Sequence, residues 1–473
     1  MKRSLLLSFC CLLAGYANAQ TLHEKLETAF TKLQRDSQCR YSSLSLTVLD
    51  AKTGEPIFSA NGDQGLATGS TMKVITTITA FNMLGKDYRF KTDLNYSGTI
   101  DAEGNLNGDL VIKGGGDPTL GSWRYEQTKE HAVLSVWVDA IRKAGIKHIK
   151  GRVIGDVSLF DTQSIPDGWI WQDLGTYFGA GTSALCWREN QFDIFLHPGS
   201  TQGSPVSVVK TVPAMPYLNF MNELTTGAPG TGDQSYPYFP ANGNSMYLRG
   251  SFGIDRAKTN ISASVPDPAF DAAYRLTDTL KRLGIDVTDE AISSTTANEK
   301  KMVFAPADKL LVSYQSPTLS QIIYWLNQKS VNLYAEQLLK AIAIASGRKA
   351  STDNGIKALH EFWKVRGIDP HSLNTYDGCG LSPEDKVTTS TLAHIIQSAR
   401  SASWYPEFYE SLPLYNNMKM KSGSISGVLC YAGFHTTPSG REVCFSIMVN
   451  NYNGKGTSIK QKIFDTLDVL KTP

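Results

Sequence analysis

The sequence predicts a fold of the α+β class, and two observations carry this prediction. Residues 74–84 are apolar enough to form a buried helix, which Gly85 would end. Residues 428–434 and 443–449 are apolar runs joined by a turn at 438–440, a pattern that predicts an antiparallel hairpin at the end of a sheet. The chain between these elements is rich in Gly and Pro and contains short strand-like pieces at 110–113, 192–196 and 206–210.

The N-terminus has the composition of a cleaved secretory signal. Lys2 and Arg3 precede an apolar core at 5–13, and small residues end the segment at Ala19. The core is too short to span a membrane, so we expect no integral membrane segment in the mature chain. Removal of the two basic residues takes the formal charge from +2 to zero. With no basic block in the chain, the sequence gives no support to a nucleic-acid partner.

The cysteines and histidines indicate neither a disulfide scaffold nor a metal site. The mature chain keeps an odd number of cysteines with irregular spacing. Cys430 and Cys444 lie on the two strands of the terminal hairpin, where two buried free thiols are favoured over a bridge. No pair of histidines has zinc-ligand spacing, and no Gly-rich loop precedes a Lys-Ser/Thr helix, so we expect no metal and no nucleotide cofactor.

Ser70 and Lys73 are the first candidates for chemistry. They are three residues apart at the start of the apolar helix and so share one helical face. A lysine held out of water has a lowered pKa, and its amine can then accept the Ser70 proton without a histidine or a metal. The alternative is that Ser70 only caps the helix. Two other Ser-x-x-Lys copies are poorer candidates, because Ser207 and Lys210 lie in a strand-like run and 346–349 ends a helix.

Two further motifs follow in the chain. Ser330 and Asn332 form a Ser-x-Asn pattern between two predicted helices, where side chains can converge on a cleft. Lys421 precedes the small residues 422–424 just before the terminal hairpin, and small residues let a ligand approach the strand closely. The literal Lys-Thr-Gly at 52–54 is predicted to be a hairpin turn instead. In this order, Ser-x-x-Lys, Ser-x-Asn and Lys-Ser/Thr-Gly are the motifs of penicillin-recognising serine enzymes.

With these motifs the chain resembles the penicillin-binding protein 4 type of D-alanyl-D-alanine carboxypeptidase/endopeptidase, a low-molecular-mass class C penicillin-binding protein of the periplasm. The likeness covers nearly the whole mature chain. Its most discriminating matches are Gly-Gly-Gly-Asp-Pro at 114–118 and Asp-Gly-Cys-Gly-Leu-Ser at 377–382. The chain departs from the family's usual pattern at Ser422 and Ser424, where Thr is usual, and at Cys379, where Ser is usual.

The resemblance implies a serine hydrolase that cleaves the D-Ala-D-Ala end of peptidoglycan stem peptides through an acyl-enzyme and is inhibited by β-lactams. It implies that Ser70 is the nucleophile and Lys73 its base. Ser330 would relay a proton to the leaving amine, and Asn332 would hold the substrate amide and the Lys73 amine. Two other functions stay open at this point: a β-lactamase, which uses the same three motifs, and a non-enzymatic wall-binding protein.

The resemblance also assigns the substrate's terminal carboxylate to the third motif. Lys421 would bind it together with the hydroxyls of Ser422 and Ser424, and Gly423 would let the strand come close. The backbone N–H groups of Ser70 and Ser424 would form the oxyanion hole.

Weaker candidates lie elsewhere in the chain. Asp156 and Phe160 match the family's pocket for the diamino acid side chain of the stem peptide, although Asp156 could be an ordinary turn residue. Asp117 and Asp377 are expected to be structural, the second by bracing its loop. Trp169 and Trp171 are expected to serve domain packing rather than to line a groove.

The implied architecture is a penicillin-recognising serine transpeptidase/β-lactamase-like catalytic domain, an antiparallel sheet flanked by helices, with two nested, mostly β inserted domains. The long separation of Lys73 from Ser330 fits an insertion of this size. One helix inside it should begin at Pro268, with Asp267 as its N-cap, and end near Leu283. The expected division is a signal peptide at 1–19, a catalytic domain at 20–92 plus 304–473, inserted domain II at 93–165 plus 265–303, and inserted domain III at 166–264.

The expected partners follow from the same likeness. They are peptidoglycan peptides and β-lactam antibiotics, met in the periplasm after cleavage of the signal. No cofactor and no nucleic acid are expected. The sequence leaves the oligomeric state open, with a dimer among the options.

Overall fold

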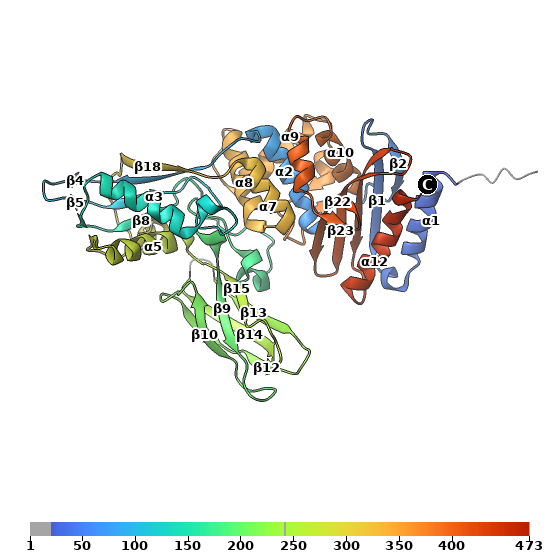
Figure 1. The fold of residues 1–473 in the computed structure, drawn as a ribbon. Coiled ribbons are helices and arrows are strands. Elements are labelled where there is room, and N and C mark those ends of the chain that lie inside the picture. The colour runs from blue at the N-terminus through green and yellow to red at the C-terminus, as the bar shows by residue number, and fades with distance from the viewer. Residues whose placement is uncertain (1–19, 241–242, 473) are drawn as a thin grey trace, which may run out of the picture.

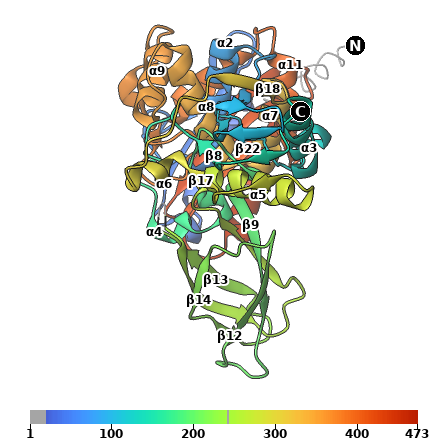
Figure 2. The ribbon, with the colours of Figure 1, turned by 90° about the vertical axis from the view of Figure 1, so that its left-hand side faces the viewer.

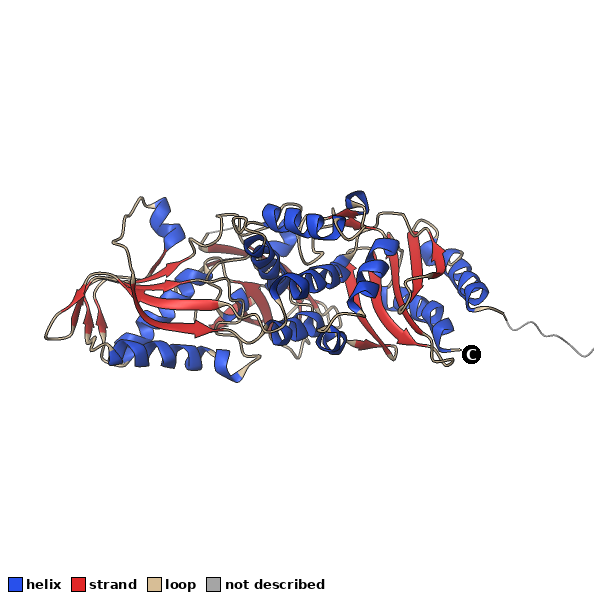
Figure 3. Ribbon diagram, turned by 90° about the horizontal axis from the view of Figure 1, so that it is seen from above, coloured by secondary structure: helices blue, strands red, loops and turns tan. Residues whose placement is uncertain are grey.

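The computed structural model describes residues 20–240 and 243–472. The molecule is elongated, with one large sheet at one end, a second β-rich region at the other, and a third that projects to the side (Figure 1). Seen from above, helices fill the middle between the two ends (Figure 3). The predicted signal peptide at 1–19 lies outside the described residues.

The large sheet has six strands in the order β2-β1-β24-β23-β22-β21, and every pair in it is antiparallel. Its strands come from the two ends of the chain: β1 (Ser43–Asp50), β2 (Pro56–Ala60), β21 (Leu414–Tyr415), β22 (Met418–Ile425), β23 (Val428–Thr436) and β24 (Glu442–Asn450). The hairpin predicted at 428–449 is therefore confirmed, and so is the turn at 52–54, which joins β1 to β2.

Each face of this sheet carries its own apolar core. Along β24, Phe445 and Ile447 pack with α1 (Leu22–Gln34) and α12 (Gly456–Leu467), whereas Cys444 and Met448 point to the other face. This alternation is the period of two that a strand imposes on its side chains. Cys430 and Cys444 are both buried and free, and they are not opposite each other in the register. The favoured interpretation of two free thiols is confirmed.

The second face is covered by helices that surround α2 (Met72–Leu84). Residues 72–81 of α2 are buried all round, which explains why the segment is apolar on every side. Gly85 ends the helix at φ 82°, a backbone conformation that favours glycine. The helices of this group besides α2 are α7 (Leu319–Lys329), α8 (Asn332–Ala345), α9 (Thr352–Lys364), α10 (Thr389–Ala399) and α11 (Tyr405–Ser411), and β19 (Leu373–Asn374) pairs with β20 (Lys386–Val387) nearby.

The far end of the molecule holds two small sheets and two long helices. The first sheet consists of β3 (Lys91–Tyr96), β6 (Leu110–Lys113), β8 (Val153–Asp156), β17 (Ile292–Ser293) and β18 (Lys309–Gln315), and the second of β4 (Thr99–Ile100), β5 (Asn105–Asn107), β7 (His148–Ile149) and β16 (Asp286–Val287). The helices at this end of the molecule are α3 (Glu130–Lys143), α5 (Pro268–Arg282) and α6 (Ser294–Glu299). Trp137 of α3 and Leu276 of α5 meet in its core. The helix predicted from Pro268 is confirmed with Asp267 as its N-cap, whereas α3 was not predicted.

The projecting region is built from strands alone, apart from the short helix α4 (Trp171–Leu174) at its base (Figure 2). Its strands are β9 (Gln191–His197), β10 (Ser207–Val212), β11 (Asn219–Asn222), β12 (Thr225–Gly227), β13 (Asp233–Tyr238), β14 (Ser245–Gly253) and β15 (Asn260–Ser264). The strand-like pieces expected at 110–113, 192–196 and 206–210 correspond to β6, β9 and β10.

The predicted domain boundaries stay a prediction. β3 and β18 pair with each other, and they are the strands through which the chain leaves the helical middle and returns to it. None of the helices in residues 20–240 and 243–472 combines the length and apolarity needed to cross a lipid bilayer.

Candidate active site

Ser70 lies in a single 3-10 turn, Gly69–Thr71, that leads into α2. This turn packs against β22 so closely that a Cβ on Gly69 would lie 2.6 Å from the Ser424 nitrogen. The N-cap of the 3-10 turn is Thr68 and the N-cap of α2 is Thr71, and neither side chain forms a capping hydrogen bond. The Ser70 hydroxyl is hydrogen-bonded to the amine of Lys73 instead. The structure therefore gives no support to a capping role for Ser70.

Lys73 is fully buried and its amine has three acceptors around it. Nζ lies 2.8 Å from Ser70 Oγ, 2.6 Å from Asn332 Oδ1 and 2.8 Å from the Cys379 carbonyl oxygen. A neutral amine has two hydrogens for Asn332 and Cys379 and one lone pair for the Ser70 hydroxyl. Burial lowers the pKa of Lys73, and the neighbouring acidic groups oppose that shift. The arrangement therefore suits an amine that takes the proton of Ser70.

The second motif sits at the junction of α7 and α8. Ser330 ends α7 in the left-handed conformation at φ 56°, which is uncommon for a residue with a side chain. Asn332 opens α8, and its Nδ2 donates to the Phe178 carbonyl oxygen at 2.8 Å. This bond fixes the orientation of the amide, so that Oδ1 faces Lys73.

Lys421 is also buried, with 1% of its surface exposed. Its Nζ donates to Ser330 Oγ at 2.9 Å and to the Ser422 carbonyl oxygen at 2.8 Å. Burial first and then the charge of Lys73 hold the pKa of Lys421 well below its usual range. No carboxylate in residues 20–240 and 243–472 pairs with this buried amine, so it is suited to receive one from a ligand.

Gly423 explains why the third motif needs a glycine. A Cβ at this position would lie 2.3 Å from the Thr68 carbonyl oxygen and 2.9 Å from the Ser70 nitrogen. Ser424, next along β22, has an exposed side chain, and Ser422 Oγ lies 3.5 Å from the Tyr415 hydroxyl. The three motifs thus meet around Ser70, although they are far apart in the chain.

Asp377 braces the loop that carries the Cys379 carbonyl, as predicted. Its Oδ1 accepts the backbone N–H groups of residues 379 and 380, and its Oδ2 accepts those of residues 381 and 382. Oδ2 also accepts the indole N–H of Trp169 at 2.8 Å, so Trp169 is buried in packing, as expected.

Three potential metal ligands lie close together beside this loop. Carboxylate oxygens of Asp377 and Glu336 and the Cys379 sulfur lie within 4.8 Å of one another. Five donors already occupy the Asp377 oxygens, so this cluster is poorly suited to hold a metal ion.

Glu336 belongs to the site and was missed in the sequence. Its Oε1 accepts the Gly378 N–H at 2.8 Å, and its Oε2 has no hydrogen-bond partner among the described residues. Burial, followed by the charge of Asp377, raises the pKa of Glu336 to about 8. Glu336 follows Asn332 by four residues on α8, and that helical spacing is the signal that could have found it.

Replacing Glu336 with glutamine should remove a pH dependence of stability. The acid has a higher pKa in the folded chain than in the unfolded one, so the folded state favours its protonated form. That stabilisation is fully present below pH 4.5 and is lost as pH rises towards 8. Thermal unfolding between pH 5 and 9 should therefore show a smaller loss of Tm in Glu336→Gln than in the wild type, since Gln still accepts the Gly378 N–H. Parallel Tm profiles would contradict the protonated state of Glu336.

Asp156 and Phe160 do not contact the three motifs through any hydrogen bond in the described part of the chain. Asp156 ends β8, and its Oδ1 accepts the Ser158 N–H at 2.8 Å, as a turn residue would. The Phe160 ring lies 5.5 Å from Nζ of the buried Lys340, which pairs with Asp161. A role for Asp156 and Phe160 in the substrate pocket stays a prediction.

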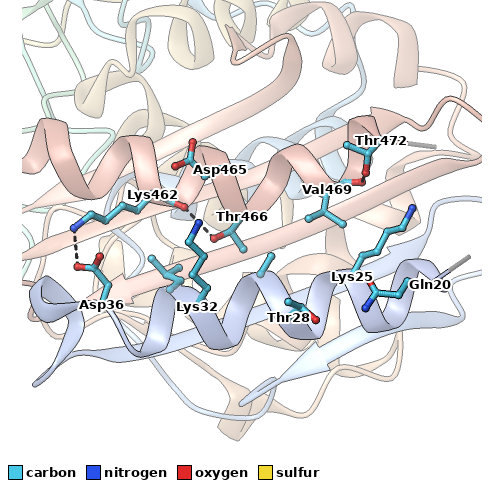
Figure 4. A pocket seen from close by; sticks show the side chains of 12 residues that line it. Gln20, Lys25, Thr28, Lys32, Asp36, Lys462, Asp465, Thr466, Val469 and Thr472 are labelled. Atoms are coloured by element: carbon cyan, nitrogen blue, oxygen red, sulfur yellow. Dashed lines mark hydrogen bonds and ion pairs between the residues drawn. The ribbon is translucent and has the colours of Figure 1, made fainter.

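A separate hollow of about 540 Å³ lies between α1 and α12 (Figure 4). Lys462 of α12 forms an ion pair with Asp36 across it at 2.6 Å. None of the motif residues lines this hollow.

The chain is similar to known proteins in both sequence and fold. Residues 26–472 match the family model described as the D-Ala-D-Ala carboxypeptidase 3 (S13) family. A D-alanyl-D-alanine carboxypeptidase of Actinomadura sp. (strain R39) is 27% identical over 440 residues, which are 86% of this chain and 78% of that protein. The D-alanyl-D-alanine carboxypeptidase DacB of Haemophilus influenzae is 24% identical over 441 residues, or 89% of this chain and 88% of that one.

Among solved structures, penicillin binding protein 4 (dacB) of Haemophilus influenzae matches with a TM-score of 0.79 at 24% identity, covering 93% of this chain and 99% of that one. The same protein complexed with a novel β-lactam matches with a TM-score of 0.72 at 21% identity, covering 95% and 100%. A likeness at this identity shows the fold. The predicted fold class, α+β with a serine transpeptidase/β-lactamase-like catalytic part, is confirmed. Of the two inserted regions, the projecting one is mostly β, whereas the one at the far end also contains the long helices α3 and α5.

Proposed function

The chain belongs to the D-Ala-D-Ala carboxypeptidase 3 (S13) family, and from that premise we propose that Ser70 is the nucleophile through which it acts. The protein is a serine-type D-Ala-D-Ala carboxypeptidase, a hydrolase of the cell wall. One observation supports Ser70 above all others: its Oγ lies 2.8 Å from the amine of the buried Lys73. That amine has lost its solvation but keeps two acceptors for its own hydrogens.

In the proposed acylation, Ser70 Oγ attacks the carbonyl carbon of the D-Ala-D-Ala bond and its proton passes to Lys73. The resulting ammonium has three hydrogens and three acceptors, Ser70, Asn332 and Cys379, so it is satisfied without moving. Proton transfer thus needs little rearrangement of the site. The oxyanion would lie between the N–H groups of Ser70 and Ser424, which the glycine contacts at 69 and 423 bring close together.

The leaving D-alanine needs a proton on its nitrogen when the C–N bond breaks. Ser330 Oγ is the proposed relay: it would give its proton to that nitrogen and recover the one that Lys73 took from Ser70, so that Lys73 becomes neutral again. Ser330 Oγ lies 2.9 Å from Lys421 Nζ and so belongs to the same set of polar groups. Water then attacks the acyl carbon and gives a proton to Lys73. Lys73 returns this proton to Ser70 Oγ as the ester bond breaks, and the shortened peptide leaves with a new carboxyl group. The free carboxylate of the substrate would pair with Lys421 and with the hydroxyls of Ser422 and Ser424.

We further propose that the enzyme also cleaves D-Ala cross-links as a DD-endopeptidase, that β-lactams acylate it, and that it works in the periplasm. The solved β-lactam complex of the Haemophilus influenzae protein, which shares this fold, supports the second point. A β-lactam presents a strained amide beside a carboxylate, so the same Ser70 and Lys421 would engage it.

Labelling with benzylpenicillin tests the proposal. The intact mass should rise by one drug molecule, peptide mapping should place the adduct at residues 70–73, and Ser70→Ala should take up no label. Ser207→Ala and Ser346→Ala, at the two other Ser-x-x-Lys copies, should label as the wild type does. An adduct on another serine would overturn the assignment, and rapid turnover of nitrocefin in place of a stable adduct would favour a β-lactamase.

A further inference from the structure

An exposed apolar segment lies between two residues that hold the active site in place. At one end, Trp169 donates its indole N–H to Asp377, and at the other, the Phe178 carbonyl accepts from Asn332 at 2.8 Å. Between these anchors, Ile170, Trp171 and Tyr177 expose 46%, 49% and 52% of their surfaces. Trp171 was expected to serve domain packing, and its ring does face Tyr238 of the projecting region, but about half of its surface stays exposed.

The aromatic surface continues from this segment onto the projecting region. The Trp171 ring lies 6.0 Å from that of Tyr238 on β13, and Tyr238 pairs across the strands with Tyr247 on β14. The Arg249 guanidinium covers both tyrosine rings, at 5.6 Å from Tyr238 and 5.0 Å from Tyr247. We call Tyr177, Trp171, Tyr238, Tyr247 and Arg249 the aromatic strip.

The strip has the character of a binding surface. Folded proteins rarely expose a run of large apolar side chains unless a ligand covers them, and Trp, Tyr and Arg dominate the contacts that carry binding energy. Because Trp169 and Phe178 tie it to Asp377 and Asn332, a ligand that lies along the strip would reach the catalytic groups. That continuity points to the substrate itself rather than to a regulatory protein.

The chemistry of the strip fits a sugar polymer. Pyranose rings have a C–H face that packs on an aromatic face, such as those of the exposed Trp171 and Tyr177, and the hydroxyl and amide groups at their edges need polar partners. The ion pair of Arg249 with Glu223, at 2.8 Å, supplies both a donor and an acceptor beside the rings. Peptidoglycan stem peptides are attached to a glycan strand, so this ligand arrives together with the scissile bond.

We propose that the aromatic strip binds the N-acetylhexosamine glycan strand that carries the stem peptide. The inference rests on the proposed function and deepens it: the enzyme acts on peptides that are still joined to their glycan in preference to free peptides. The strip would hold the polymer while its stem peptide enters the site at Ser70.

The preference can be measured with two substrates, a pentapeptide attached to a glycan chain and the same pentapeptide free in solution. It is the kcat/KM for the attached peptide divided by the kcat/KM for the free one. Trp171→Ala should lower this ratio at least about tenfold, and Tyr247→Ala, on a strand of the projecting region, should lower it in the same direction. Trp123→Ala is the matched control, since Trp123 exposes 47% of its surface and lies near Arg124 but outside the strip. Its ratio should equal that of the wild type.

Direct binding provides a second measurement that does not depend on turnover. A peptide-free N-acetylglucosamine–N-acetylmuramic acid oligosaccharide should change the tryptophan fluorescence of Ser70→Ala, and the added Trp171→Ala substitution should abolish the change. Equal kcat/KM ratios in all variants would overturn the inference, and so would unaltered oligosaccharide binding in the double variant. These are the results expected if the aromatic strip served a protein partner instead. Failure of benzylpenicillin to label wild-type Ser70 would instead count against the proposed function.

Discussion

Replacing Lys73 with arginine should lower the rate of acylation by benzylpenicillin at least about a hundredfold, within the range that a general base contributes. The guanidinium keeps its proton at any pH the protein tolerates, so it cannot accept the one on Ser70. In the wild type, burial lowers the pKa of Lys73 and leaves the amine free to act. The measurement is the second-order rate of adduct formation, followed by intact mass, with Tm as a check that the fold survives.

The chain offers matched controls for this substitution. Lys210 and Lys349 complete the other two Ser-x-x-Lys copies, and both side chains are exposed. Lys210→Arg and Lys349→Arg should acylate at the wild-type rate. If Lys73→Arg also acylated at that rate, Lys73 would have no part in the mechanism.

The parts of the site that lie within one element could be predicted from the sequence. Helical spacing paired Ser70 with Lys73, and their polar atoms lie 2.8 Å apart in the structure. The hairpin of β23 and β24 followed from its apolar runs and its turn. In each case the period of the element decides which side chains meet, so a single stretch of sequence holds the information.

The contacts that come from distant segments could not be predicted in this way. Phe178 reaches Asn332 through a backbone carbonyl, and Cys379 reaches Lys73 in the same manner, so the side chains of these two residues give no sign of either bond. Glu336 was missed because a glutamate on a helix is usually exposed. Here α8 packs between other helices and Glu336 meets the loop at Gly378, so its side chain is buried. The helix α3 was not predicted, because the insertion in which it lies was expected to be mostly β. Its apolar face, which includes Trp137, was the signal for a helix there.

Lys421 should account for most of the recognition of the substrate's free carboxylate. It is buried, its hydrogen bonds are to Ser330 and to a carbonyl, and no described carboxylate pairs with it. Before a substrate binds, burial holds the pKa of its amine low, and the carboxylate of a bound substrate would raise that pKa and keep the amine protonated, so that the two form a charged pair. Lys421→Ala should cost about 2–5 kcal/mol in transition-state binding of a D-Ala-D-Ala peptide, the range for removal of one partner of a buried charged pair. The same peptide with an amidated terminus should already be a poor substrate and should lose much less.

The two proteins and the two substrates form a double-substitution cycle, and the difference between the two losses in kcat/KM gives the coupling between the amine and the carboxylate. Lys419→Ala is the control, because Lys419 lies two residues earlier on β22 and pairs with Glu410 near the surface at 3.4 Å. Its substitution should leave both substrates within about twofold of the wild type, since exposed ion pairs contribute little. Equal losses on the acid and the amide in Lys421→Ala would mean that Lys421 shapes the site without binding the carboxylate. The carboxylate would then have to be assigned to the hydroxyls of Ser422 and Ser424, the remaining polar groups of β22 beside Gly423.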